Sequence, residues 1–302
     1  MKKTFKTYLT ESQRLPHWPK TLEELKAAYV KICVDPNTGE VLMPVDGHWG
    51  DGVSDVIYND DLTVTLKPQG PESATIEKWM LVDGYLPFPF KECNLPFEVA
   101  NDCELKSLAG LPEKCESISY RLNALAPTVK NLVGGPKEVN SFSLEHCSVE
   151  SLEGFPKVDE EGSIFLTTPS LKDFSGIPRR IKHLTIGKSQ HFTHESFEHL
   201  PQQAELIAFT DVPNLHSLHN LHKHVKTLQR LGIFKTKITS AILGLALIKG
   251  LEEVDPEFFN KNDMSWRIDD IENIVDKYIG SGEIFDFQDA LEEAGEKELA
   301  KL

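Results

Sequence analysis

The sequence has 302 residues, is 40 % hydrophobic and carries a net charge of −15. The hydrophobic content suffices for a sizeable core, whereas the acidic balance argues against nucleic acid as the main partner, because phosphate binding needs clustered Lys and Arg. No apolar run reaches the roughly 18 residues of a membrane span, and we expect neither a membrane segment nor a secretory leader. The five cysteines contain no Cys-x-x-Cys pair, which predicts reduced thiols in a cytosolic protein.

The N-terminal third is expected to contain one helix and several short strands. Residues 1–20 are predicted to be a leader or a flexible tail, basic over the first eleven residues and then Pro-containing. Thr21 and Glu24 have the spacing of a capping box, which predicts a helix through about Lys31. Residues 21–84 are therefore predicted to form a helix and a β-rich unit, with short strands over 40–45, 53–58, 62–66 and 79–82.

A short phrase recurs between residues 85 and 234. It reads Leu-Lys-Ser-Leu-Ala-Gly-Leu-Pro at 105–112 and returns at 129–136, 149–156 and 171–178, with weaker copies that end at 201 and 222. The closing positions are 20 to 24 residues apart, a period typical of a leucine-rich-repeat-like solenoid. The Leu and Val residues of the phrase are expected to point inward, and its Gly to occupy a bend that needs positive φ or close contact between turns.

Each copy of the phrase is followed by two apolar residues that alternate with polar ones. This alternation at a fixed phase predicts one short strand per turn and a parallel stack of strands. The predicted inward pairs are Phe97/Val99, Ile118/Tyr120, Phe142/Leu144, Ile164/Leu166, Leu184/Ile186 and Ile207/Phe209.

The periodicity ends near Gly232, and the remaining residues read as an acidic helical cap over 235–302. Helical spacing predicts helices over 238–253, 269–279 and 284–301. From Glu252 to the end there are 16 acidic and 5 basic residues, a balance of −11. This charge is interpreted as a solvated face that keeps the protein soluble, or alternatively as a surface that docks on a basic partner.

The stretch Phe-Ser-Leu-Glu-His-Cys-Ser-Val-Glu-Ser-Leu-Glu-Gly-Phe-Pro-Lys at 142–157 resembles the repeat unit of a leucine-rich-repeat-like family of tailed phages. Residues 37–47, 243–254 and 285–302 are similar to the flanks of those repeats. The chain departs from the family where most copies lack the usual turn Asn, and where the last two lack the Gly-Pro pair. The resemblance implies an α/β repeat fold and a phage origin, and no established activity.

The N-terminus has a second resemblance. Residues 1–11 look like the capsid-targeting leader of internal proteins in T-even-like phages, which a maturation protease cuts after a Leu-x-Glu sequence. Leu9-Thr-Glu11 matches that sequence, so processing between Glu11 and Ser12 is what the resemblance implies. The alternative is a disordered or lightly docked tail.

Metal binding and catalysis find little support in the sequence. His216, His219 and His222 have a spacing that gathers metal ligands on a helix, but the repeat register places His216 and His219 at variable outward positions. Residues 46–55 are oxygen-rich like a calcium loop, yet lack the EF-hand spacing and its terminal Glu. Nucleotide-binding and hydrolase motifs are absent from the sequence, so we predict no metal, no cofactor and no enzyme.

The predicted function is therefore a non-enzymatic binding protein that acts on a host or phage protein in the host cytoplasm. It would serve as an inhibitor or adaptor, for example against an anti-phage defence protein, with contacts expected at Ser119, Ser143, Phe165 and Thr185. One alternative is an internal virion protein packaged through its leader and located in the virion interior. A second is a divergent metal-dependent enzyme that uses the histidine-rich end.

Overall fold

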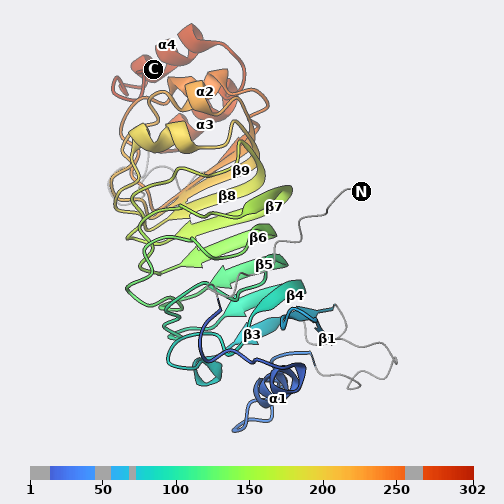
Figure 1. The fold of residues 1–302 in the computed structure, drawn as a ribbon. Coiled ribbons are helices and arrows are strands. Elements are labelled where there is room, and N and C mark those ends of the chain that lie inside the picture. Colours follow the sequence, from blue (N-terminus) through green and yellow to red (C-terminus); the bar gives the residue numbers. More distant parts are fainter. Residues whose placement is uncertain (1–13, 45–55, 68–72, 256–267) are drawn as a thin grey trace, which may run out of the picture.

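The computed structural model describes residues 14–44, 56–67, 73–255 and 268–302 (Figure 1). The helices, with short 3-10 helices labelled η, are α1 (Leu22–Ile32), η2 (Lys78–Met80), η3 (His194–His199), α2 (Leu221–His224), η4 (Leu243–Leu247), α3 (Ile268–Tyr278) and α4 (Ile284–Glu293). The strands are β1 (Val56–Tyr58), β2 (Val64–Leu66), β3 (Ala74–Ile76), β4 (Phe90–Val99), β5 (Lys114–Tyr120), β6 (Glu138–Glu145), β7 (Lys157–Thr167), β8 (Arg180–Gly187), β9 (Gln203–Thr210), β10 (Thr227–Phe234) and β11 (Glu253–Val254).

One sheet runs through the whole described chain. Its strands follow one another in the order β1-β2-β4-β5-β6-β7-β8-β9-β10-β11, and β3 also pairs with β4. From β4 to β11 every pairing is parallel. Figure 1 shows these strands stacked along one axis, with α1 at one end of the stack and α4 at the other. The chain is therefore a parallel-strand solenoid, as the repeat predicts.

The register of the sheet matches the predicted apolar pairs. Phe97 pairs with Ile118, Ile118 with Phe142, and the row continues through Ile164, Leu184, Ile207 and Leu231. All of these side chains are buried, as are the second members of the pairs, Val99, Tyr120, Leu144, Leu166, Ile186 and Phe209. The inward face of the strands therefore forms one side of a continuous apolar core.

The return segments between strands β4 and β8 differ from the predicted α/β repeat. Residues 100–113, 121–137, 146–156 and 168–179 contain no helix, and isolated parallel bridges join Leu105 to Leu125 and Ser151 to Asp173. Short helices appear on the return side only later, as η3, α2 and η4. The parallel strands of the prediction are confirmed, whereas the helical half of each repeat is not seen in these turns. The Leu residues of the phrase pack inward without needing a helix, for example Leu108 and Leu152.

The sheet crosses both predicted domain boundaries. At residue 85, β2 and β3 both pair with β4, and beyond residue 234, β11 pairs with β10. One cluster of buried hydrophobic residues extends from Leu25 to Ala300. The N-terminal unit and the C-terminal segment thus share one sheet and one core with the repeats.

The N-terminal predictions are confirmed only in part. Helix α1 begins after Thr21, whose side chain accepts from the Glu24 backbone N–H at 3.1 Å. Strands β1 and β2 lie within their predicted ranges. The strand predicted over 79–82 is wrong, because residues 78–80 form the 3-10 helix η2. The strand predicted over 40–45 is reduced to one bridge between Val34 and Val41 within the described residues, and β3 was not predicted.

The C-terminal segment contains two of the three predicted helices, α3 and α4. The helix predicted over 238–253 is wrong, because that apolar stretch forms only η4 and then β11. Backbone hydrogen bonds from Gly280 to Leu245 and from Gly282 to Ala246 tie the linker between α3 and α4 to this stretch. The rings of Tyr278 and Phe287 stack between the two helices at 5.5 Å.

All five cysteines are buried. Burial raises the pKa of Cys93, Cys103 and Cys147 to about 12, and it also raises the pKa of Cys115. Because the thiolate is the reactive form, we expect these four thiols to react slowly at neutral pH in the folded protein.

A water-soluble thiol reagent is therefore expected to label none of the five cysteines of the native protein within minutes at neutral pH, and all five in urea. The measurement is thiol titration by absorbance, with mass spectrometry to locate the label. Rapid labelling of any of these cysteines without denaturant would contradict the packing described here.

Candidate functional site: the outward face of the parallel sheet

The four residues predicted to contact a partner lie side by side on the sheet. Ser119 of β5 pairs with Ser143 of β6, Ser143 with Phe165 of β7, and Phe165 with Thr185 of β8. Because side chains alternate along a strand, this row points away from the buried pairs on either side of it. We call the row the outward row; it continues through Ala208 and Gly232.

A second row on the same face is also built from short side chains in its first half. Ser117 pairs with Ser141, Ser141 with Ser163, and Ser163 with His183. The Ser141 hydroxyl accepts from the Ser163 backbone N–H at 3.3 Å, and the Ser163 hydroxyl lies 3.3 Å from His183 Nδ1. Short hydroxyl side chains at both rows leave this part of the face flat and polar.

Phe165 is an exposed aromatic residue on this polar part of the sheet face. Its side chain is 41 % exposed, although its neighbours in the outward row are Ser143 and Thr185. Aromatic residues in such positions commonly supply much of the binding energy of a protein interface. Phe234, by contrast, is half-buried, because its ring covers Gly232: a Cβ added to that glycine would lie 2.6 Å from Phe234 Cε2.

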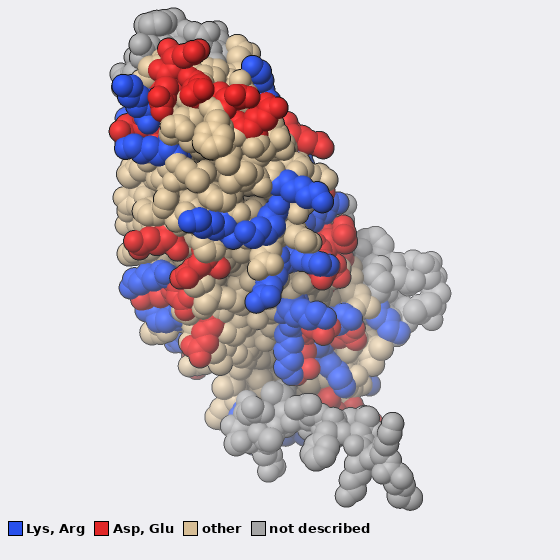
Figure 2. All heavy atoms as spheres, turned by 90° about the horizontal axis from the view of Figure 1, so that it is seen from above, with Lys and Arg blue, Asp and Glu red and all other residues tan. Residues whose placement is uncertain are grey.

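Charged side chains border the face at its two ends. Arg121 pairs with Glu98 at 3.3 Å near β4 and β5. Near β9 and β10, Glu205 pairs with Arg230 at 3.3 Å and lies 3.5 Å from His183. Figure 2, which views the molecule along another direction, shows acidic side chains gathered toward one end, with Lys and Arg beside them, and a run of Lys and Arg across the middle.

The histidine-rich end does not form a metal centre in the described part of the chain, where no group of His, Cys, Asp and Glu is arranged to hold a metal ion. His216 and His219 are exposed, as the register predicts, and their Nδ1 atoms approach the carbonyl oxygens of Lys237 and Leu302 at 3.2 and 2.5 Å. His222 is half-buried, and burial lowers its pKa. The calcium-loop candidate at 46–55 and the processing site Glu11/Ser12 lie outside the described residues.

One feature of the surface was not predicted from the sequence. A mainly polar cavity of about 270 Å³ opens beside the starts of β8, β9 and β10, and its lining includes Arg179, Gln202 and Lys223. These residues belong to three successive turns, so no single copy of the repeat contains the cavity. The only sequence signal is that four of the six positions that follow the closing residues of the phrase are basic, namely Lys137, Lys157, Arg179 and Lys223.

In the described residues, the helices are too short or too polar to span a membrane. No protein-family model, curated protein sequence or solved structure matches the chain.

Proposed function

We propose that this chain is a non-enzymatic, leucine-rich-repeat-like binding protein of phage origin, closed by a helical C-terminal cap. Its outward row holds a host or phage protein, and the complex inhibits that protein or links it to another. The observation that carries the proposal is the exposed aromatic ring of Phe165, which lies between the short hydroxyl side chains of Ser143 and Thr185.

The chemistry of the face fits a protein partner. Ser119, Ser143 and Thr185 offer hydroxyl groups that both donate and accept hydrogen bonds, and their short side chains let another backbone approach closely. Phe165 supplies a rigid apolar anchor at the centre of the row, where surrounding contacts exclude water from the ring. The partner would therefore present an apolar pocket to Phe165, with polar groups around it.

Replacing Phe165 by arginine is expected to weaken partner binding by about tenfold or more, because the anchor ring is lost and a charge is placed at the centre of the contact. Tagged full-length protein would first identify the partner from bacterial lysate, with and without phage infection, by mass spectrometry. Calorimetry with the purified partner then compares the wild type with Phe165→Arg.

The matched control is Phe285→Arg, since Phe285 is 80 % exposed but lies at the start of α4, far along the chain from the outward row. A photo-crosslinking amino acid at position 165, and again at 285, reports which site touches the partner. Crosslinking from 285 alone, with full affinity retained by Phe165→Arg, would reject the outward row as the binding face.

A further inference from the structure

Basic residues predominate at the positions where consecutive strands begin. We call this region the start edge, and we define it by the eight residues at these positions: Lys91, Glu113, Lys137, Lys157, Arg179, Gln202, Lys226 and Lys249. Backbone hydrogen bonds link neighbouring turns here, for example from Lys137 N–H to the Glu113 carbonyl and from Gln202 N–H to the Arg179 carbonyl, both at 2.8 Å. Side chains of the start edge are therefore stacked at the spacing of adjacent parallel strands, roughly 4.8 Å.

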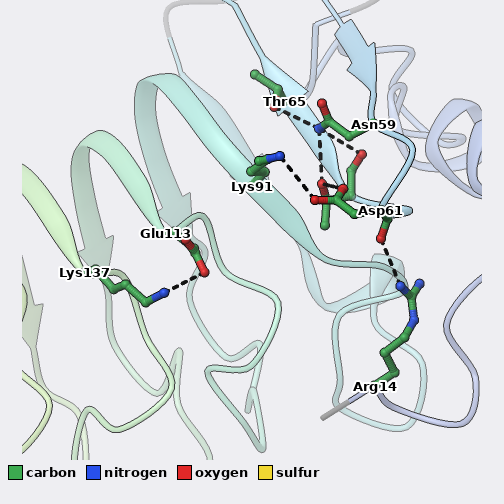
Figure 3. Close-up of polar contacts among 8 residues, drawn as sticks. Arg14, Asn59, Asp61, Thr65, Lys91, Glu113 and Lys137 are labelled. Atoms are coloured by element: carbon green, nitrogen blue, oxygen red, sulfur yellow. Dashed lines mark hydrogen bonds and ion pairs between the residues drawn. The ribbon is translucent and has the colours of Figure 1, made fainter. Parts of the chain in front are cut away.

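The first half of the start edge is neutralised by ion pairs. Lys91 Nζ lies 3.2 Å from Asp61 Oδ2, and Lys137 Nζ lies 2.7 Å from Glu113 Oε1 (Figure 3). Asp61 is itself held in place, because its carboxylate accepts from Thr63 and its backbone carbonyl accepts from Arg14 at 3.0 Å. Acidic and basic residues here lie on adjacent turns and balance one another.

The same balance is found on the return side of the solenoid. Glu150 lies between Lys130 and Lys172, with Oε to Nζ distances of 2.7 and 2.6 Å. Hydrogen bonds from the two ammonium groups lower the pKa of Glu150 to about 2. On both sides of the solenoid, therefore, some adjacent turns place opposite charges together.

The second half of the start edge departs from this pattern. Within the described residues, no carboxylate pairs with the side chains of Lys157, Arg179, Lys226 or Lys249. At the matching position between Arg179 and Lys226 the chain has Gln202, which is neutral. Lys157 has Glu138 opposite it in the sheet register, whereas the cations of Arg179, Lys226 and Lys249 raise the local positive potential around Gln202.

The cavity of about 270 Å³ lies in this uncompensated half. Its lining combines the end of η3, the end of α2 and the segment before β8, and it includes Arg179, Gln202, Lys223 and His224 as hydrogen-bond donors. Lys223, like Arg179, has no ion-pair partner in the described part of the chain. The one acidic residue of the lining, Glu198, lies 3.5 Å from His199 Nε2, which also lines the cavity.

We propose that this cavity binds a compact oxyanion, either free phosphate or the phosphate group of a small phosphomonoester. The planar guanidinium of Arg179 matches two phosphate oxygens at once, and Lys223 adds a compact charge from the neighbouring turn. A volume of about 270 Å³ falls just below the roughly 300–1,000 Å³ of sites for drug-sized ligands, which favours a small ligand. The proposal is independent of the outward row and of any protein partner.

Inorganic phosphate is the first probe, titrated into the full-length protein by isothermal calorimetry at low ionic strength, where screening is weakest. We expect saturable binding with one site per chain. Arg179→Gln and Lys223→Gln are each expected to weaken it about tenfold or more, because each removes a charge-assisted hydrogen bond to the anion. Glu198→Gln is expected to strengthen binding, because it removes a like charge from the lining.

The matched control is Lys157→Gln, which changes the net charge equally on the same edge but outside the cavity lining. It is expected to alter the affinity by less than about twofold, since exposed charges that do not touch the ligand act only through a screened field. Equal losses in Lys157→Gln and Arg179→Gln would show general charge attraction and would overturn the site.

Glycerol phosphate, titrated in the same way, distinguishes the two sources of the anion. Tighter binding than inorganic phosphate identifies a phosphomonoester as the ligand, and weaker binding identifies the free ion. If neither probe gives saturable binding to the wild-type protein, the proposal is wrong. Phe165→Arg is expected to bind phosphate like the wild type, so the outcome here does not depend on the proposed partner face.

Discussion

Replacing Phe192 by alanine is expected to lower the free energy of unfolding by about 3–5 kcal/mol. Phe192 is completely buried and lies between β8 and η3. Its ring contacts the rings of Phe174 at 4.9 Å, Phe209 at 5.4 Å and Phe197 at 6.1 Å. Truncation leaves a cavity among three aromatic rings that belong to successive parts of the stack, and rigid packing prevents them from closing it.

Urea unfolding followed by circular dichroism measures this loss. Phe285→Ala provides the control, because it removes the same ring from a side chain that is 80 % exposed; it is expected to change the stability by less than about 0.5 kcal/mol. Similar losses in the two variants would contradict the placement of Phe192 at the centre of the aromatic cluster.

Replacing Gly154 by alanine is expected to destabilise the protein by about 2–5 kcal/mol, for two separable reasons. Gly154 has φ +82°, where an L-residue is strained by roughly 1–2 kcal/mol. In addition, an added Cβ would lie 2.5 Å from the backbone nitrogen of Val133 in the preceding turn. The turns would have to separate locally to admit it, and overpacking of this kind costs typically about 1–3 kcal/mol.

Gly282→Ala separates the two contributions. Gly282 has nearly the same φ, +81°, but a Cβ there meets no atom within 4 Å. This variant is therefore expected to lose only the conformational part, roughly 1–2 kcal/mol. Thermal melting and urea unfolding of both variants give the comparison. If Gly154→Ala is no less stable than Gly282→Ala, the close contact between adjacent turns does not exist.

The repeat phrase predicted most of the fold because it combines two independent signals. Alternation of apolar residues gives the face of each strand, and the fixed phase after the closing residue gives the register between strands. The positive φ values at Gly110, Gly134, Gly154 and Gly176 agree with the bend expected there. Conformations of single non-glycine residues had no such signal: His146, Lys188, Asp211 and Lys235 also have positive φ just after their strands.

The errors fall where the apolar pattern is not periodic. The stretch from Ile238 to Leu251 is buried at most positions. Because a buried segment has no exposed polar face, its sequence lacks the periodic pattern that distinguishes a helix from an extended segment. Strand β3 has the small residue Ala74 at one of its two buried positions, so its apolar alternation is weaker than that of Val64 and Leu66 in β2. The cavity at the start edge was missed for another reason, because the lack of ion pairs at Arg179 and Lys223 depends on neighbours more than twenty residues away.

The stacking of the strands also determines how the molecule resists mechanical load. The hydrogen bonds that join β4 to β11 run along the axis of the stack, and the first and last helices lie at its opposite ends (Figure 1). Tension between these ends pulls on one strand interface at a time instead of shearing all of them together. A chain pulled end-first through a narrow opening would accordingly unfold one turn at a time.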